Sequence, residues 1–325
     1  MRLVAVTRVL NEDDIIEAFV RHHARLLDHH VLLDNGSTDR TIEILRALKQ
    51  EGSQLTVLQN TSASFAESEY NTVLFNLAGR NFNADWVLYL DCDEFLDERR
   101  VPGGLRARLA QMGPNDNCLQ LPLWTYHPLA DDDSEEPIVP RRIRRRNTAF
   151  AEMGKLCIRG SLAGAGVQVV AGAHVAVWQN RILAPQLALD LPLAHYYRRS
   201  PWQQLTKVVV GWLKTLTGGQ FTRDSQINIH YRGTFQKLRD DPAKVLLDPA
   251  FLCYAPNEAD IVDDPIAYAG GPLRYTEMVD PRMKTVSVIT GYAEALAQQH
   301  ARLIDEVPPA RALVEKSALE WTQIV

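Results

Sequence analysis

Three carboxylates fall within four residues, directly after a short apolar run. Residues 86–90 are almost wholly apolar, and Asp91, Asp93 and Glu94 follow them. Carboxylates at the end of a buried strand repel one another and lose hydration unless a positive charge lies among them. Carboxylate oxygens are also the ligands that Mg²⁺ and Mn²⁺ prefer. The Asp-x-Asp pair therefore predicts a divalent cation that binds a diphosphate, with a solvated acidic turn as the alternative.

Polar side chains also follow three earlier apolar segments. These polar groups lie at residues 8–12, 34–37 and 60–64. In open α/β sheets, ligands bind outside the carboxyl ends of the strands. If the apolar segments are parallel strands, all of these polar groups share one rim of the sheet. The sequence therefore predicts a ligand site along that rim.

Strand-like and helix-like segments alternate through the first hundred residues. Short apolar runs predict strands, and apolar residues at helical spacing after N-cap residues predict helices. This alternation predicts a Rossmann-like, mostly parallel sheet with right-handed crossovers and flanking helices. The predicted strands are residues 3–10, 31–33, 55–58 and 86–90, and the predicted helices lie within residues 15–27, 37–52 and 66–78.

The pattern weakens past residue 100. Residues 131–136 form an acidic loop, and residues 141–146 form an arginine-rich run. The arginines either pair with that loop at the surface or clamp a phosphate or an anionic acceptor. Residues 167–178 alternate loosely and predict paired strands. Further helices are predicted at residues 201–216 and 286–304.

The domain organisation follows from this change of pattern. We predict that residues 1–235 form the catalytic domain, with a nucleotide-binding half at 1–100 and an acceptor-side half at 101–235. Residues 236–325 are predicted to be a largely helical C-terminal extension that forms a homodimer, covers the site or docks to a membrane partner. Four histidines near the first helix are predicted to lie on the surface: His22, His23, His29 and His30.

Composition excludes several classes of protein. The net charge of −5 gives no general attraction to nucleic acid. No apolar run approaches the roughly 20 residues that span a bilayer, and the N-terminus has no cleavable signal layout. The four cysteines are scattered without a Cys-x-x-Cys pair, so we expect reduced thiols. We therefore expect a cytoplasmic protein, with peripheral association at the inner face of a membrane through a partner as a further possibility.

Three motifs in order resemble those of a family 2-type glycosyltransferase. They are Thr-Arg-Val-Leu-Asn-Glu at 7–12, Leu-Asp-Asn-Gly-Ser-Thr-Asp-Arg-Thr at 33–41 and Leu-Asp-Cys-Asp-Glu-Phe at 90–95. More narrowly, the chain resembles the bacterial branch whose Asp-x-Asp is followed by Glu-Phe, and segments 155–159 and 194–202 are similar to that branch too. The resemblance covers about residues 1 to 215 and is firm over the first hundred.

The resemblance implies a GT-A fold and a nucleotide-sugar donor, with a UDP-sugar favoured. Asp34 matches the acidic position that contacts uracil or ribose, but Asn35 follows it where many relatives have a second Asp, so the base preference stays open. Asn71 and Lys155 have plain surface roles as alternatives, and His195 has a structural one. The expected donor contacts are Arg8, Asn11, Glu12, Asp34, Asn71, Asp91 and Lys155, and the expected metal ligands are Asp91, Asp93 and His195.

The implied reaction is metal-dependent sugar transfer to an acceptor hydroxyl on a carbohydrate or a lipid-linked glycan, with inversion. The cation, Mn²⁺ or Mg²⁺, would neutralise the leaving diphosphate, and a carboxylate would accept the proton. The candidates for this base are Glu94 and an aspartate of the 131–133 loop, taken as Asp133. The alternatives are a non-catalytic nucleotide-sugar or glycan-binding module of a polysaccharide assembly complex, and a nucleotidyltransferase, although residues 7–14 lack its glycine-rich phosphate loop.

Overall fold

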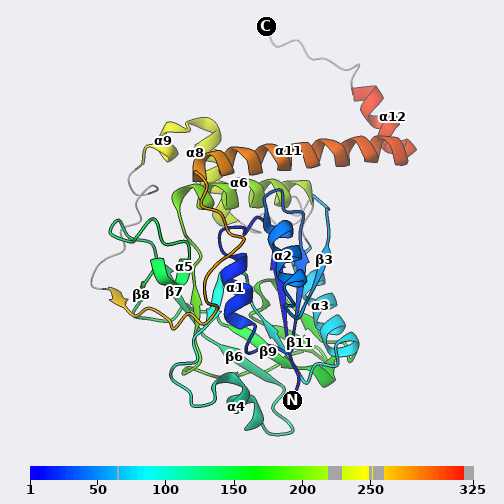
Figure 1. Ribbon diagram of the computed structural model, residues 1–325. Helices are drawn as coiled ribbons and strands as arrows, with labels where there is room; N and C mark the ends of the chain where they lie inside the picture. The colour runs from blue at the N-terminus through cyan, green and yellow to red at the C-terminus, as the bar shows by residue number, and fades with distance from the viewer. Residues whose placement is uncertain (64–65, 219–228, 249–250, 252–259, 318–325) are drawn as a thin grey trace.

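The first third of the chain alternates strands and helices, as the sequence predicts. The computed structural model describes residues 1–63, 66–218, 229–248, 251 and 260–317 (Figure 1). In chain order the first elements are β1 (Leu3–Val9), α1 (Ile16–His23), β2 (His29–Asp34), α2 (Thr41–Gln50), β3 (Leu55–Gln59), α3 (Glu67–Asn81) and β4 (Trp86–Tyr89).

These strands form the parallel part of a seven-stranded sheet with the order β13-β6-β9-β4-β1-β2-β3. Strands β3, β2, β1 and β4 are mutually parallel, whereas β9 runs antiparallel to both β4 and β6. The mixed but mostly parallel sheet confirms the predicted α/β fold class. The added strands are β6 (Cys118–Leu121), β9 (Lys155–Arg159) and β13 (Gln186–Leu187).

Side chains from both faces of this sheet are buried. Leu3 and Ala5 of β1 pack in the cluster that contains α1 and α2, whereas Val4 and Val6 pack in the cluster that contains α3. Successive residues of a strand point to opposite faces, so a strand covered on both faces reads as one apolar run. This burial explains why the sequence reveals these strands so clearly.

A second, five-stranded sheet has the order β15-β8-β7-β14-β5 and places His195 beside the Asp-x-Asp motif. Strands β14 and β5 pair antiparallel, and their register sets His195 opposite Glu94. The Tyr196 amide extends this ladder by donating to the Asp93 carbonyl at 2.8 Å. The strands are β5 (Glu94–Leu96), β7 (Leu123–His127), β8 (Arg145–Asn147), β14 (Leu193–His195) and β15 (Ile261–Asp263).

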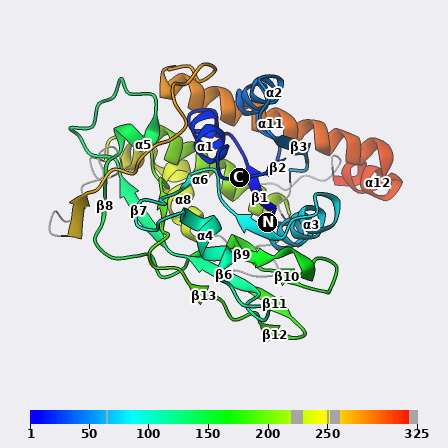
Figure 2. The same cartoon turned by 60° about the horizontal axis from the view of Figure 1, so that its bottom comes forward.

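Smaller elements complete the body around the two sheets. Strands β10 to β12 form a third sheet, which lies beside β6 and β9 (Figure 2). Cys92, Cys118 and Cys157 are buried free thiols, and Cys253 lies outside the described residues. The remaining short elements are α4 (Gly104–Ala110), α5 (Val139–Arg142), β10 (Gln168–Val169), β11 (Ala176–Trp178) and β12 (Arg181–Ile182).

Two long helices cross the carboxyl edge of the parallel strands. Helix α6 (Pro201–Thr217) lies between this edge and α11 (Pro281–Glu306), whose far end carries α12 (Pro308–Ser317) away from the body (Figure 1). Val210 of α6 packs with Val288 and Tyr292 of α11 in one buried cluster. None of the helices in the described part of the chain is both long and apolar enough to span a bilayer. Two shorter helices are α8 (Ile229–Asp240) and α9 (Ala243–Leu246).

The surface location predicted for the early histidines is wrong for three of them. His22, His23 and His30 are buried, and His29 is half-buried. His22 and His23 lie on α1 against Phe95, and His30 contacts the Thr7 hydroxyl at 2.8 Å. Both ring nitrogens of His22 and His23 have hydrogen-bond partners, so these polar side chains pack as core residues.

The buried histidines predict loss of stability in mild acid. Burial lowers the pKa of His22 to about 4 and that of His30 to about 3. Between the unfolded pKa near 6.5 and these values, the unfolded state binds more protons, so the free energy of unfolding falls as the pH falls. Replacing His30 by Gln should reduce the slope of that free energy between pH 6 and 5 by about 1.4 kcal/mol per pH unit, measured by urea denaturation. Exposed His300, replaced by Gln, is the control, and equal slopes for wild type and His30→Gln would refute the prediction.

Candidate active site

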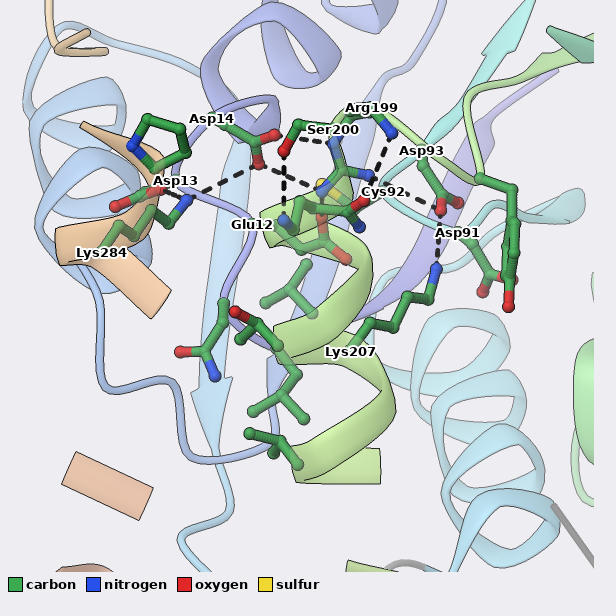
Figure 3. Close-up of a pocket in the computed structure, with 18 of the residues that line it drawn as sticks. Glu12, Asp13, Asp14, Asp91, Cys92, Asp93, Arg199, Ser200, Lys207 and Lys284 are labelled. Atoms are coloured by element: carbon green, nitrogen blue, oxygen red, sulfur yellow. Dashed lines mark hydrogen bonds and ion pairs between the residues drawn. The ribbon is translucent and has the colours of Figure 1, made fainter. Parts of the chain in front are cut away.

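A cavity of about 790 Å³ opens at the carboxyl edge of the parallel strands, where the sequence predicts a ligand site. Its walls come from the loops after β1 and β4, from residues 128–142, from α6, and from residues 277–285. Figure 3 shows the part of the wall that contains the loops after β1 and β4, Lys207 and Lys284. The segment that leads into α11 therefore contributes to the cavity, although it belongs to the predicted C-terminal extension.

The two aspartates of the Asp-x-Asp motif lie in the cavity wall with cationic partners. Asp91 accepts from the Lys155 ammonium at 2.5 Å and lies 3.7 Å from the Arg8 guanidinium. Asp93 accepts from the Lys207 ammonium at 3.1 Å and lies 3.8 Å from Arg199. Burial alone would raise the pKa of both carboxyls, but these cations hold each pKa below its usual range. Both carboxylates are therefore ionised at neutral pH.

His195 lies on the opposite side of the Asp93 carboxylate from the cations. Its Nε2 is 3.7 Å from Asp93 Oδ1, whereas Lys207 and Arg199 approach Oδ2. Burial lowers the pKa of His195, with Asp93 opposing that shift. The imidazole is thus neutral at neutral pH, the form in which histidine ligates a metal.

These residues fit an open metal site rather than a closed one. No group of three or more His, Cys, Asp or Glu side chains that could hold a metal occurs among the described residues. Mg²⁺ in phosphate-binding sites uses only one or two protein carboxylates and takes its other ligands from substrate phosphates and water. Asp93 and His195 could serve in such a site, with Asp91 in the same wall.

Glu94 supports the motif from inside the protein. Its side chain is buried, accepts from the Asp91 amide at 2.9 Å and lies 3.6 Å from Lys155. Burial raises the pKa of Glu94 well above its usual value. Glu94 does not line the cavity, so the structure favours a supporting role over that of the base. Lys155 is likewise buried behind Asp91 and does not reach the cavity as a donor contact.

At the other end of the cavity, Asn35 lines the wall where a contact from Asp34 was expected. The Asp34 carboxylate is fully buried and accepts from the Gly36 and Ser37 amides and from Gln59. It closes an Asx turn, the turn-residue alternative to ligand binding. Asn35 lines the cavity, and both polar atoms of its buried side chain have no hydrogen-bond partner. A buried amide without a partner is costly, so this residue indicates a ligand contact.

Two more expected donor contacts have internal partners. Asn11 lines the cavity, but its side-chain oxygen accepts from the Thr38 amide at 2.8 Å and so joins the loops after β1 and β2. Asn71 is buried and donates to the Val170 carbonyl at 3.0 Å, outside the large cavity. Asn71 therefore ties α3 to the residue that follows β10.

A buried ionic network forms the wall next to the loop after β1. Arg199 donates to Glu12 at 2.5 Å and to Asp14 at 2.7 Å (Figure 3). Burial raises the pKa of Glu12 to about 7, with Arg199 opposing the shift. Lys284 of α11 pairs with Asp13, which ties the C-terminal helix to this loop. Glu12, which was predicted to contact the sugar-nucleotide donor, thus pairs with a side chain of the protein.

The acidic loop presents Asp132 rather than Asp133 to the cavity. Asp133 is exposed and accepts from the Glu135 amide at 3.0 Å. Asp132 is half-buried, lines the cavity and accepts from the Leu129 amide at 2.8 Å. Burial raises the pKa of Asp132, as a proton acceptor requires. Of the nearby arginines, Arg145 pairs with Asp131 at the surface and only Arg142 of the 141–146 run lines the cavity.

Sequence reasoning missed the contribution of helix α6. Ser200 caps this helix by accepting from the Gln203 amide, and the cavity-lining residues Gln203, Lys207, Val210 and Lys214 recur at helical spacing. Two lysines on one face of a helix that otherwise reads as apolar were the available signal. Lys214 donates to the carbonyls of Asn35 and Ser62, near the unpartnered amide.

The fold and the site define an α/β glycosyltransferase of the GT-A type. The family profile described as "Glycosyl transferase family 2" matches residues 5–149, the part of the chain that contains all three early motifs. The resemblance drawn from the early motifs is thereby confirmed, and the match favours glycosyl transfer over nucleotidyl transfer. No curated protein sequence matched the chain.

Similar solved structures include a mannosyltransferase from Pyrobaculum calidifontis in complex with GDP-Man and Mn²⁺, at 14% identity and a TM-score of 0.41, covering 98% of this chain and 84% of that one. Another is glucosyl-3-phosphoglycerate synthase from Mycobacterium tuberculosis in complex with Mn²⁺, UDP-glucose and phosphoglyceric acid, at 14% identity and a TM-score of 0.35, covering 67% and 80%. These low scores assign neither a donor nor an acceptor to this chain.

Proposed function

We propose that this protein transfers a sugar from a nucleotide-diphosphate sugar, with a UDP-sugar favoured, to an acceptor hydroxyl with inversion at the anomeric carbon. The observation that carries the proposal is the cavity within the family 2 fold, which brings Asp91, Asp93 and His195 together at the carboxyl edge of the sheet. We place the reaction in glycan or polysaccharide synthesis in the cytoplasm, with a carbohydrate or lipid-linked acceptor.

The donor would lie along helix α6 in this proposal. The unpartnered Asn35 amide would contact the nucleobase, because its NH₂ group can donate to a base edge and its carbonyl oxygen can accept from it. Lys207 and Arg8 would face the diphosphate, since both line the cavity beside the Asp-x-Asp pair. Lys207 lies seven residues before Lys214, and two helical turns span about 10 Å, which suits the separation of a base from its diphosphate.

Asp93 and His195 would hold a divalent cation, Mn²⁺ or Mg²⁺, together with the donor phosphates. When bound, such a cation supplies Lewis-acid neutralisation of the charge that develops on the leaving diphosphate. The chain's own part is to keep Asp93 ionised, through Lys207 and Arg199, and His195 neutral, through burial. Both states are those that metal ligation requires.

A direct test of this function is the release of UDP or GDP from a panel of sugar nucleotides, with Mn²⁺ or with EDTA. We expect turnover with at least one donor and Mn²⁺, and product analysis should show inverted anomeric configuration. Donor binding without any turnover, across a range of acceptors, would instead favour the non-catalytic binding module.

In this proposal, Asp132 is the general base that accepts the proton of the acceptor hydroxyl. Asp132→Asn should lower turnover by roughly 10²- to 10⁴-fold, as expected for loss of a general base, with little change in donor affinity. Asp133→Asn is a matched control one residue away, because that side chain is exposed and does not line the cavity. Equal rates for the two variants would remove Asp132 from the mechanism.

A further inference from the structure

Lys207 already holds the carboxylate that the proposed cation would use. The Lys207 ammonium lies 3.1 Å from Asp93 Oδ2, and the Arg199 guanidinium lies 3.8 Å from the same oxygen. The Asp93 side chain is only 4% exposed, so water screens these charges weakly. The Asp93 carboxylate is therefore paired with two cationic side chains in a poorly hydrated part of the cavity wall.

The negative charge of Asp91, the other aspartate of the motif, is balanced in the same way. Asp91 has Lys155 at 2.5 Å and Arg8 at 3.7 Å. A divalent cation that entered this wall alone would add two positive charges next to groups that already have positive partners. Repulsion between like charges at such distances is strong where the dielectric is low. A diphosphate would remove this repulsion, because its negative oxygens can pair with the divalent cation and with the lysine at the same time.

Arg199 and Lys207, the two cationic side chains beside Asp93, differ in how freely they can move. Arg199 is 1% exposed and is bound on its other sides by Glu12 and Asp14. Lys207 is 26% exposed, lines the cavity, and has its ammonium 4.5 Å from the centre of the Tyr197 ring. A lysine has a flexible stem and a compact charge, so Lys207 can turn from Asp93 to a phosphate without disturbing the network.

We propose that Lys207 makes binding of the divalent cation conditional on the donor diphosphate, by occupying Asp93 until the diphosphate arrives and then pairing with it. The inference rests on the proposed function. It makes Lys207 a positioning residue that acts through Asp93 and sets the order in which cation and donor bind.

The test measures binding rather than turnover. Free Mn²⁺ is counted by electron paramagnetic resonance in titrations of wild type and Lys207→Met, with and without UDP, and UDP affinity is measured in EDTA by calorimetry. Wild type should bind Mn²⁺ at least roughly tenfold more tightly with UDP than without. Lys207→Met should bind Mn²⁺ without UDP roughly tenfold more tightly than wild type, and should bind UDP in EDTA roughly tenfold more weakly.

Two further variants make the outcome decisive. Lys244→Met removes an exposed lysine of α9 and should match wild type in every titration. Lys207→Arg keeps the positive charge, so it should retain the dependence on UDP even if Lys207→Met folds poorly. The inference is overturned if wild type binds Mn²⁺ equally with and without UDP, if folded Lys207→Met binds nucleotide-free Mn²⁺ no more tightly than wild type, or if Lys207→Arg loses the dependence on UDP. Absence of binding of any uridine or guanosine diphosphate to the wild type would refute the proposed function itself, and the inference with it.

Discussion

Asp93→Asn is expected to lower sugar transfer by roughly 10³-fold or more, with a fold that is retained. The substitution keeps the shape of the side chain but removes the charge that lies beside His195, Lys207 and Arg199. An amide is a poor ligand for a hard divalent cation, and loss of Lewis-acid neutralisation costs several kcal/mol in the transition state, at about 1.4 kcal/mol per tenfold in rate. The measurement is the steady-state release of nucleoside diphosphate at saturating Mn²⁺.

The control for this experiment is Asp263→Asn. Asp263 is half-exposed and lies 3.4 Å from the exposed Arg144, which precedes β8, far along the chain from the motif. Its removal should change turnover by less than twofold. Thermal unfolding of each variant separates loss of chemistry from loss of fold. If folded Asp93→Asn retains a tenth or more of the wild-type rate, Asp93 has no direct part in binding the cation.

The largest expected effect on stability belongs to Arg199. Arg199→Met should lower the free energy of unfolding by about 3–5 kcal/mol, because it leaves Glu12 and Asp14 as buried carboxylates without their partner. The guanidinium donates to both at 2.5 and 2.7 Å, and its side chain is almost completely buried. A single ammonium cannot reproduce this forked contact, so Arg199→Lys should recover only part of the loss. Urea denaturation at pH 7 measures each value.

Two comparisons show whether unpaired buried charges cause the loss of stability in Arg199→Met. Arg144→Met removes an exposed arginine from a surface pair and should cost less than about 1 kcal/mol. Adding Glu12→Gln and Asp14→Asn to Arg199→Met should restore much of the stability, because the uncompensated charges are then absent. If the triple variant loses as much free energy of unfolding as the three single changes added together, the destabilisation comes from lost packing rather than from unpaired charge.

The alternation of parallel strands and helices could be predicted because residues close together in the chain determine each element. β1 and β4 are apolar and buried on both faces, and helices with apolar residues at helical spacing separate the four strands, so the period of the pattern reveals each element. Parallel strands with helical crossovers must place their carboxyl ends on one edge. The location of Asp91 and Asp93 in a cavity at that edge followed from these rules alone.

The choice between adjacent polar residues could not be made in this way. Asn35 rather than Asp34, and Asp132 rather than Asp133, faces the cavity. Neighbouring residues point in nearly opposite directions in extended or turn backbone, so the choice depends on the backbone angles of one residue. The Asx turn closed by Asp34 settles the first case and the hydrogen bond between Asp132 and Leu129 helps settle the second.

By itself, then, the sequence determined the α/β class, the edge of the sheet that carries the site, and the acidic motif at its centre, because each depends on residues close together in the chain. Only the tertiary structure decided which cations those acids meet. Lys155 reaches the motif from β9, Arg199 from the segment before α6, and Lys207 from within α6. Lys284 reaches the loop after β1 from α11. Charges paired over such separations leave no periodic trace in the chain, since the pairing is produced by the packing of helices across the sheet edge.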